Sequence, residues 1–418
     1  MSRFILVIIC ISLLLGTFRS TPIRYDGYRL YRVLPQRSDH LQLLAKLEVE
    51  STGLVFLDAI SSPGNYVSIL VAPEAIDGFV EILRNHKIIH ELAEENFQHI
   101  LDTERVELRK TSATSYDWTG YHTLNETYDW LESLAKNHPN QVEVLLGGRT
   151  YEGRQIRGVK VSFKSGNKGI FLEGGIHANE WISPAMATYI LNEILTNSEP
   201  NIRSLVERFD WYIFPHFNPD GYVYTHTTDR LWRKTRSKGL VCDGADPNRN
   251  WGFRWMEIGA SKEECSSNFG GKTEFSEVEA KSLSEYLLTL KGKIHTYISF
   301  HAHGQLLMYP YAAIKENAPN HEHLQRIGEA AVRALSKRYG TQYTLGSTYE
   351  VIYPAAGSSP DWVYSTLNVP VVFTYELRPL KSSNGFILPS SQILPSGLET
   401  FDSLLSLIAE ADSLGYYS

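Results

Sequence analysis

The sequence has little excess charge of one sign, few cysteines and only one long apolar run, and each scarcity excludes a class of protein. With 40 Lys and Arg against 47 Asp and Glu, the net charge is −7. A nucleic-acid partner is therefore not expected, because it would require a basic patch. No internal repeat and no low-complexity tract is present. The 418 residues are 43% hydrophobic, enough to fill a large core and long enough for two domains.

The one long apolar run lies at the N-terminus. It covers residues 4–15 and follows Arg3. About a dozen residues are too few to cross a bilayer, and small or polar residues follow from Gly16. We therefore expect a secretory signal peptide over residues 1–20, cleaved between Gly16 and Thr21, and a secreted protein without a membrane partner. A membrane anchor is the less favoured alternative.

Only three cysteines are present, and the first, Cys10, leaves with the signal peptide. Cys242 and Cys265 remain, and in an oxidising compartment an even number of cysteines favours a disulfide. Two free buried thiols are the alternative. One N-glycosylation sequon begins at Asn125.

Residues 28–92 alternate short strands and helices in the order β-α-β-β-α-β, which is the ferredoxin-like α+β arrangement. The expected strands span residues 28–34, 54–60, 66–72 and 87–92, and the expected helices begin with Ser38 as N-cap and at Pro73.

A polar, helical stretch over residues 94–110 follows and ends in Arg109-Lys110. The small polar residues 111–115 come next. A dibasic pair before such a stretch is a target for a trypsin-like protease, although an ordinary solvated linker is the alternative.

A second unit begins near Tyr121, where Thr123 and Glu126 have the spacing of a capping box. Beyond it, apolar strands alternate with helices, which predicts an α/β fold with a mixed, mainly parallel sheet between helices. The strands are expected at residues 142–146, 156–163, 169–176, 210–214, 294–300 and 371–376, and the helices near 183–196, 276–290, 320–338 and 389–413.

Three residues near the ends of these strands have the chemistry of a metal site. His177 and Glu180 are separated by two residues, and His301 follows far along the chain. Two imidazoles and one carboxylate leave the fourth position of a tetrahedral zinc ion open, as in catalytic sites. Ligands of α/β folds gather at the carboxyl ends of strands, so we expect one zinc ion there. The H-x-x-E spacing alone is a weak signal, because it recurs by chance.

Five further motifs follow one another along the chain, and their order strengthens the expectation of a zinc site. They are the turn from Asn218 to Tyr222, Arg230 to Arg236, Asp246 to Trp251, Ile352 to Trp362, and Thr374 to Arg378. In this order the chain resembles the zinc metallocarboxypeptidases of the pancreatic carboxypeptidase A/B type, over essentially its whole length. The resemblance implies a secreted zymogen that hydrolyses the C-terminal peptide bond of peptides and proteins.

The resemblance also implies a role for each matching residue. His177, Glu180 and His301 would hold zinc; Asp246 would orient His177; Asn248 and Arg249 would bind the substrate's C-terminal carboxylate; Arg233 would lie beside the scissile carbonyl; Tyr353 would close over the substrate; Glu376 would act as general base and acid.

By the same resemblance, residues 21–110 form an activation segment and residues 111–418 the catalytic domain. A trypsin-like protease would cut at Arg109 or Lys110 and release a monomeric enzyme. The family has a cis peptide at the junction that matches Arg378-Pro379.

The pocket for the terminal side chain determines which residue is removed. By position it is lined by Ala312, Thr348, Ala355, Ser358, Pro360 and Thr374. Pro360 stands at the base, which is acidic in the forms that remove Lys and Arg, so we expect an A-type preference for aliphatic and aromatic residues. If the loop were shifted by one residue, Asp361 could serve a basic side chain, which is the B-type alternative.

Two cleft positions depart from the family pattern. Asn179 stands where an arginine is common, and His303 where an aromatic residue, commonly tyrosine, is usual. A different class of function, a secreted non-catalytic binding protein on the same fold, is disfavoured because the zinc ligands, Arg233 and Glu376 are all retained.

Overall fold

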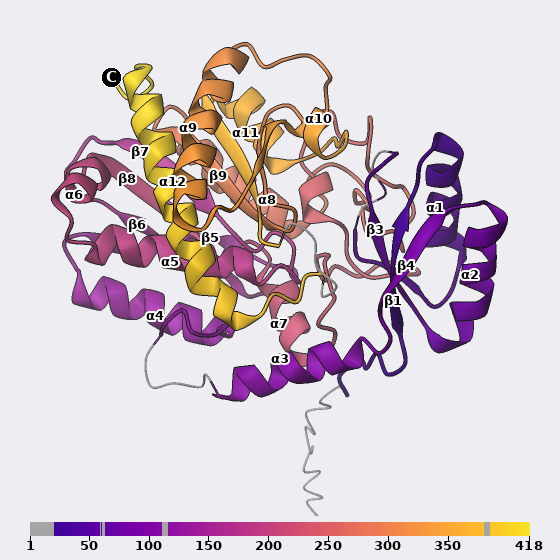
Figure 1. Cartoon of the computed structure of the whole chain (residues 1–418). Coiled ribbons are helices and arrows are strands. Elements are labelled where there is room, and N and C mark those ends of the chain that lie inside the picture. The colour runs from indigo at the N-terminus through magenta and orange to yellow at the C-terminus, as the bar shows by residue number, and fades with distance from the viewer. Residues whose placement is uncertain (1–20, 59, 61–62, 111–115, 380–384) are drawn as a thin grey trace, which may run out of the picture.

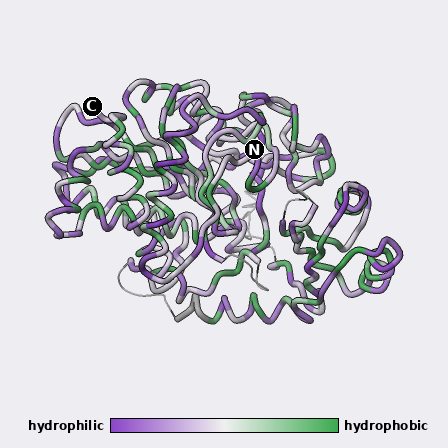
Figure 2. Tube along the Cα trace, turned by 45° about the horizontal axis from the view of Figure 1, so that its top comes forward, coloured by the Kyte–Doolittle hydropathy of each residue, from purple (hydrophilic) through white to green (hydrophobic). Residues whose placement is uncertain are grey.

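The computed structural model describes residues 21–58, 60, 63–110, 116–379 and 385–418. The predicted signal peptide and the predicted linker at 111–115 lie outside the described residues. A smaller N-terminal unit, ending at residue 110, stands beside a larger C-terminal unit, which begins at residue 116 (Figure 1). In both units the hydrophobic residues concentrate along the inner strands and the inward-facing sides of helices (Figure 2).

The N-terminal unit is an antiparallel sheet of four strands in the order β2-β3-β1-β4, with two helices. Its elements are β1 (Arg29–Leu34), α1 (Ser38–Glu50), β2 (Leu54–Phe56), β3 (Val67–Val71), η1 (Pro73–Ala75), α2 (Ile76–Asn85) and β4 (Ile89–Glu94). The ferredoxin-like prediction is confirmed.

Two details of this unit were predicted incorrectly. Ser38 is the first helical residue of α1, and the N-cap is Arg37, which makes no side-chain capping bond. The helix α3 (Gln98–Lys110) begins later than residue 94, because Ile89–Glu94 pairs with β1 as strand β4.

The C-terminal unit is built on an eight-stranded mixed sheet in the order β11-β10-β12-β9-β7-β8-β6-β5. The four central strands β12, β9, β7 and β8 run parallel to one another, as predicted. The strands are β5 (Val142–Arg149), β6 (Gln155–Val161), β7 (Lys168–Glu173), β8 (Phe209–Phe214), β9 (Ile294–Ala302), β10 (Leu306–Tyr309), β11 (Thr344–Ser347) and β12 (Val371–Leu377).

Helices cover both faces of this sheet. One face packs against α4 (Leu124–Asn137), α5 (Ile182–Thr196), α9 (His321–Tyr339) and α12 (Ile393–Ser413), and the other against α8 (Val278–Thr289) and α11 (Ser359–Leu367). Successive side chains of β7 point to opposite faces of the sheet. Ile170 and Leu172 belong to the hydrophobic core on the first face, and Phe171 belongs to the core on the second. The predicted capping box at Thr123 is confirmed. Shorter elements are α6 (Pro200–Val206), α7 (Pro219–Thr227), η2 (Pro247–Arg249), α10 (Thr348–Val351) and η3 (Ser390–Gln392).

Two local predictions in this unit were wrong. The segment from Asn218 is not only a turn but begins α7, where the Asn218 side chain caps the helix by accepting from the N–H of Gly221 at 2.9 Å. Strand β7 ends at Glu173 rather than at residue 176, because Gly175 has a φ of +66° that an extended strand does not adopt.

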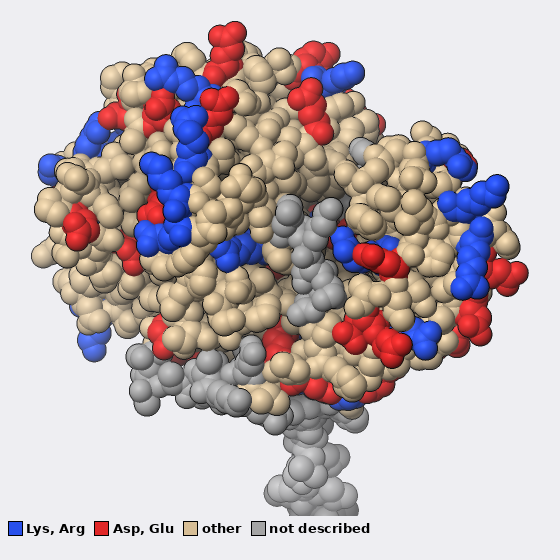
Figure 3. All heavy atoms as spheres, in the orientation of Figure 1, with Lys and Arg blue, Asp and Glu red and all other residues tan. Residues whose placement is uncertain are grey.

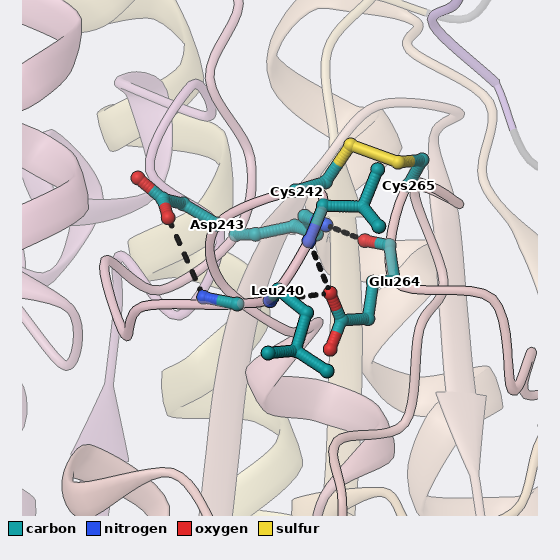
Figure 4. The surroundings of a disulfide bond; sticks show 8 residues. Leu240, Cys242, Asp243, Glu264 and Cys265 are labelled. Carbon is teal, nitrogen blue, oxygen red and sulfur yellow. Dashed lines mark hydrogen bonds between the residues drawn. A yellow bond between two sulfur atoms is a disulfide. The ribbon is translucent and has the colours of Figure 1, made fainter.

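The disulfide between Cys242 and Cys265 is present, as predicted. Beside it, one carboxylate oxygen of Glu264 accepts from the backbone N–H groups of Leu240 and Val241 at 2.8 and 2.9 Å (Figure 4). The side chains of Leu240 and Val241 consequently stand out from the loop, with relative exposures of 91% and 83%.

Acidic and basic side chains lie near one another on the face drawn in Figure 3. In the part of the chain that the structure describes, no helix combines the length and the apolar character that crossing a membrane would require.

Candidate active site

Three side chains converge where strands β7 and β9 end. His177 lies on the loop after β7, Glu180 immediately before α5, and His301 near the end of β9. The Glu180 carboxylate approaches Nδ1 of His177 at 2.7 Å and Nδ1 of His301 at 3.2 Å. Among the described residues, these three form the only group of this kind whose atoms could hold a metal ion.

The surroundings of the three side chains fit a zinc ion. Asp246 lies 3.1 Å from Nε2 of His177, so a proton on Nε2 leaves the Nδ1 lone pair facing the Glu180 carboxylate. The two Nδ1 atoms of His177 and His301 also approach to 3.1 Å. Three donor atoms at such distances can surround one cation, and tetrahedral zinc bonds of about 2.1 Å would place ligand atoms roughly 3.4 Å apart. The donor set of two imidazoles and one carboxylate is that of a catalytic zinc.

Asp246 couples this site to Arg233. Its second oxygen accepts from Nη2 of Arg233 at 3.0 Å, and Nη1 of Arg233 lies 3.3 Å from Glu180. Burial by itself would raise the pKa of Asp246, but the positive charges of Arg233 and Arg249 hold this pKa well below its usual value. Asp246 therefore stays an anion that both orients His177 and aims Arg233 at the metal site.

Glu376 reaches the same place from the neighbouring strand. It pairs with His301 in the parallel register of β12 and β9, so the two side chains arise side by side. Burial and the negative charge of Glu180 raise the pKa of Glu376 well above its usual value. A raised pKa makes the Glu376 carboxylate a stronger proton acceptor than an ordinary carboxylate.

A second group of residues lines the same cavity. Arg249 stands on η2 with its Nη2 3.1 Å from the hydroxyl of Tyr353. Its Nε and Nη1 donate to the carbonyls of Gly259 and Asn248, which fixes the plane of the guanidinium. A planar, fixed fork of this kind is suited to bind a carboxylate through two parallel bonds.

The predicted pocket residues line one cavity of about 330 Å³ with the metal triad, Arg233, Asn248, Arg249, Tyr353 and Glu376. Asp361 also lines it, but its carboxylate accepts from the backbone N–H groups of Ala312 at 2.9 Å and Ala313 at 2.8 Å. Burial raises the pKa of Asp361 to about 7. Its oxygens are thus occupied by the protein backbone rather than directed at a bound side chain.

A buried connection that the sequence did not predict lies beside the cavity. Glu173, the last residue of β7, accepts from the hydroxyls of Ser299 at 2.8 Å and Ser359 at 3.0 Å. The N–H of Ser359 in turn donates to Asn248 at 2.9 Å. Glu173 therefore links the strand of His301 to the residues around Asn248. An acidic residue in an otherwise apolar strand was the signal that could have revealed it.

The N-terminal unit covers the cavity. Phe56, Leu57 and Asp58 of this unit line it. The Asp58 carboxylate lies 3.7 Å from Nε2 of His303, whose ring packs edge-on against Phe386 at 5.2 Å. His303 is therefore a wall residue of the covered cleft.

A buried ion pair anchors this cover. Arg230 donates from Nε and Nη2 to the Glu104 carboxylate of α3 at 2.7 and 3.0 Å, and both side chains are more than 90% buried, with exposures of 8% and 7%. Arg230 also donates to the carbonyl of Asn179 at 2.8 Å and lies 3.6 Å over the ring of Trp181. Helix α3 is thus tied to the two residues that flank the metal ligand Glu180, a connection that the sequence did not predict.

Comparisons with known proteins agree with this geometry. The zinc carboxypeptidase family model matches residues 127–403, and the carboxypeptidase activation peptide model matches residues 31–104. The chain is 50% identical over 397 residues to "Zinc carboxypeptidase A 1" of Anopheles gambiae, covering 94% of this chain and 92% of that one. It is 43% identical over 290 residues to "Carboxypeptidase B" of Astacus astacus, covering 68% of this chain and 95% of that one.

A solved structure, carboxypeptidase A from Helicoverpa armigera, superposes with a TM-score of 0.85 at 27% identity, covering 94% of this chain and all of that one. The family models together span both units described above. The chain therefore belongs to the zinc carboxypeptidase family and carries the activation peptide of a zymogen ahead of its catalytic domain.

Proposed function

We propose that the activated protein removes apolar and aromatic residues one at a time from the C-termini of peptides and proteins. The observation that carries the proposal is the single cavity that joins the metal triad and Glu376 to Arg249. A group that recognises a free carboxylate at one end allows only the last peptide bond to reach the metal site. The enzyme is then an exopeptidase.

Each residue of the cavity has a distinct task. Arg249 and Asn248 bind the terminal carboxylate and set the register of the chain. Glu376 accepts a proton from the attacking water and returns it to the leaving amine. Arg233, held by Asp246, donates to the carbonyl oxygen as negative charge develops there. Zinc, held by the triad, supplies Lewis acidity that polarises the scissile carbonyl and lowers the pKa of water.

The preference for apolar side chains follows from the pocket. Pro360 offers no charge, and both oxygens of Asp361 are engaged with the N–H groups of Ala312 and Ala313. A Lys or Arg side chain would therefore lose its hydration without gaining a counter-ion. Apolar side chains would gain about 25 cal/mol for each Å² buried.

The experiment that tests this function uses the full chain after trypsin treatment. It is incubated with peptides that differ only in the last residue, each as free acid and as C-terminal amide, and the products are read by mass spectrometry. Loss of Phe or Leu from the free acids alone is expected. Selective loss of Lys and Arg would contradict the A-type preference, and no trimming at all would favour a non-catalytic binding protein.

Arg249→Lys should lower kcat/KM for free-acid peptides by about 10²-fold, since a lysine provides one point charge in place of two parallel charged bonds. The discrimination between free acid and amide should shrink as well. The matched control is Arg254→Lys, the same exchange at an exposed pair with Glu257. If Arg249→Lys retained wild-type discrimination, the carboxylate would be bound elsewhere.

We further propose that residues 21–110 are the activation segment, released when a trypsin-like protease cuts at Arg109 or Lys110, and that residues 111–418 are the catalytic domain. Helix α3 supports this proposal, because it ends at Lys110 and its Glu104 anchors the N-terminal unit over the cavity. The predicted signal peptide supports secretion, and we propose that the secreted protein acts as a monomer.

Glu104→Gln should weaken the hold of the severed segment on the enzyme by about 10²-fold, because an unpaired buried guanidinium costs about 3 kcal/mol. After trypsin cleavage, the segment should leave sooner and activity should rise faster. Size-exclusion chromatography of the cleaved chain measures the release directly. The control Glu91→Gln removes an exposed pair with Arg32 in the same unit and should change little. Equal release rates for the two variants would contradict the anchoring role.

A further inference from the structure

The pocket for the terminal side chain contains a buried hydroxyl that the mechanism does not use. Ser358 lines the cavity and is 5% exposed. Within the described part of the chain, its Oγ has no hydrogen-bond partner. Ser358 stands at the N-cap of α11, yet its side chain does not cap that helix. A buried hydroxyl without a partner is unfavourable, so it indicates a partner supplied by the bound substrate.

Two other polar side chains of the pocket are already engaged. The hydroxyl of Thr348 donates to the carbonyl of Tyr309 at 3.2 Å. Asp361 accepts from Ala312 and Ala313. The remaining lining at Ala355 and Pro360 is apolar. The pocket therefore combines an apolar body with the neutral hydroxyls of Ser358 and Thr374, each of which can both donate and accept, and of these the Ser358 hydroxyl is fully buried without a partner among the described residues.

We propose that Ser358 is a specificity-determining residue that favours C-terminal side chains ending in a neutral hydrogen-bonding group. Tyrosine is then removed in preference to phenylalanine, and glutamine in preference to methionine. The inference rests on the proposed carboxypeptidase function and names its substrate class more closely. A site that pairs with a substrate hydroxyl or amide discriminates against the analogue that lacks it, because the buried group of the site is then left unpaired.

The test compares kcat/KM for peptides that end in Tyr or Phe, and in Gln or Met, on the trypsin-treated full chain. We expect Tyr to exceed Phe by about 3- to 10-fold, the range of one neutral hydrogen bond. Ser358→Ala should bring this ratio close to one, chiefly by slowing the Tyr peptide. The matched control is Ser365→Ala, the same exchange on the same helix at a residue outside the cavity lining, and it should keep the wild-type ratio.

A binding measurement separates this inference from the function on which it rests. The trypsin-treated Glu376→Gln protein, which should bind without turnover, is titrated calorimetrically with the peptides ending in Tyr and Phe. Tighter binding of the Tyr peptide, lost in the double variant with Ser358→Ala, supports the inference even if hydrolysis were absent. A wild-type preference for Phe, equal values for the two peptides, or a Tyr preference that survives Ser358→Ala would overturn it.

Discussion

Glu376→Gln is expected to lower kcat by about 10³- to 10⁴-fold, the upper range for the loss of a general acid–base residue. The amide keeps the size of the side chain but cannot accept the proton of the attacking water. Zinc content should stay at one ion per chain, because Glu376 is not one of the three residues that form the metal group. KM should change little, since Arg249 and Asn248 still bind the carboxylate.

Single-turnover kinetics, together with metal analysis of the same preparation, measure both halves of this expectation. Glu350→Gln is the matched control: the same exchange on α10, outside the cavity lining, should keep wild-type turnover. A Glu376→Gln enzyme that hydrolyses peptides at near-normal rate would refute the proton-transfer role. If it also lost zinc, Glu376 would instead act as a metal ligand.

Removing zinc should abolish hydrolysis and also lower the melting temperature. The three ligands His177, Glu180 and His301 are almost fully buried, and Glu180 is only 2% exposed. Without a cation, their electron pairs face one another across about 3 Å, which is unfavourable in a site shielded from water. A ligand that binds only the folded state at about 10³ times its Kd stabilises that state by about 4 kcal/mol.

Dialysis against a chelator, followed by activity and thermal unfolding measurements, tests this expectation. One equivalent of zinc should restore both properties, whereas magnesium should restore neither, because it prefers sites made of oxygen ligands. Glu180→Gln should bind zinc more weakly and start from the lower melting temperature. Hydrolysis that continued at the original rate in metal-free protein would contradict a catalytic zinc.

Local patterns in the sequence were sufficient for much of the fold. The capping box at Thr123 and the period of the apolar residues identified α4 and the main helices, because these signals depend on neighbours within a few residues. Elements without such a signal were missed. Strands β10 and β11 have only four residues each, and α7 begins at a motif that reads as a turn.

The proximity of two metal ligands could be predicted from the sequence, whereas that of the third could not. The spacing of His177 and Glu180 already implied that these two side chains lie close together, because they are only three positions apart in the loop between a strand and a helix. His301 lies 124 residues beyond His177, and only the parallel pairing of β7 with β9 brings it to 3.1 Å. The order of strands in the sheet likewise sets Glu376 beside His301.

The sequence by itself determined the residue types of the site, their order along the chain and the family to which they belong, because side-chain chemistry and local spacing are properties of the chain. Only the tertiary structure decided that Asp361 turns its carboxylate to backbone N–H groups, that Ser358 keeps a buried hydroxyl in the pocket, and that Glu104 meets Arg230. Such contacts join elements that are distant in sequence. Their partners depend on how strands and helices pack, and no local pattern encodes that packing.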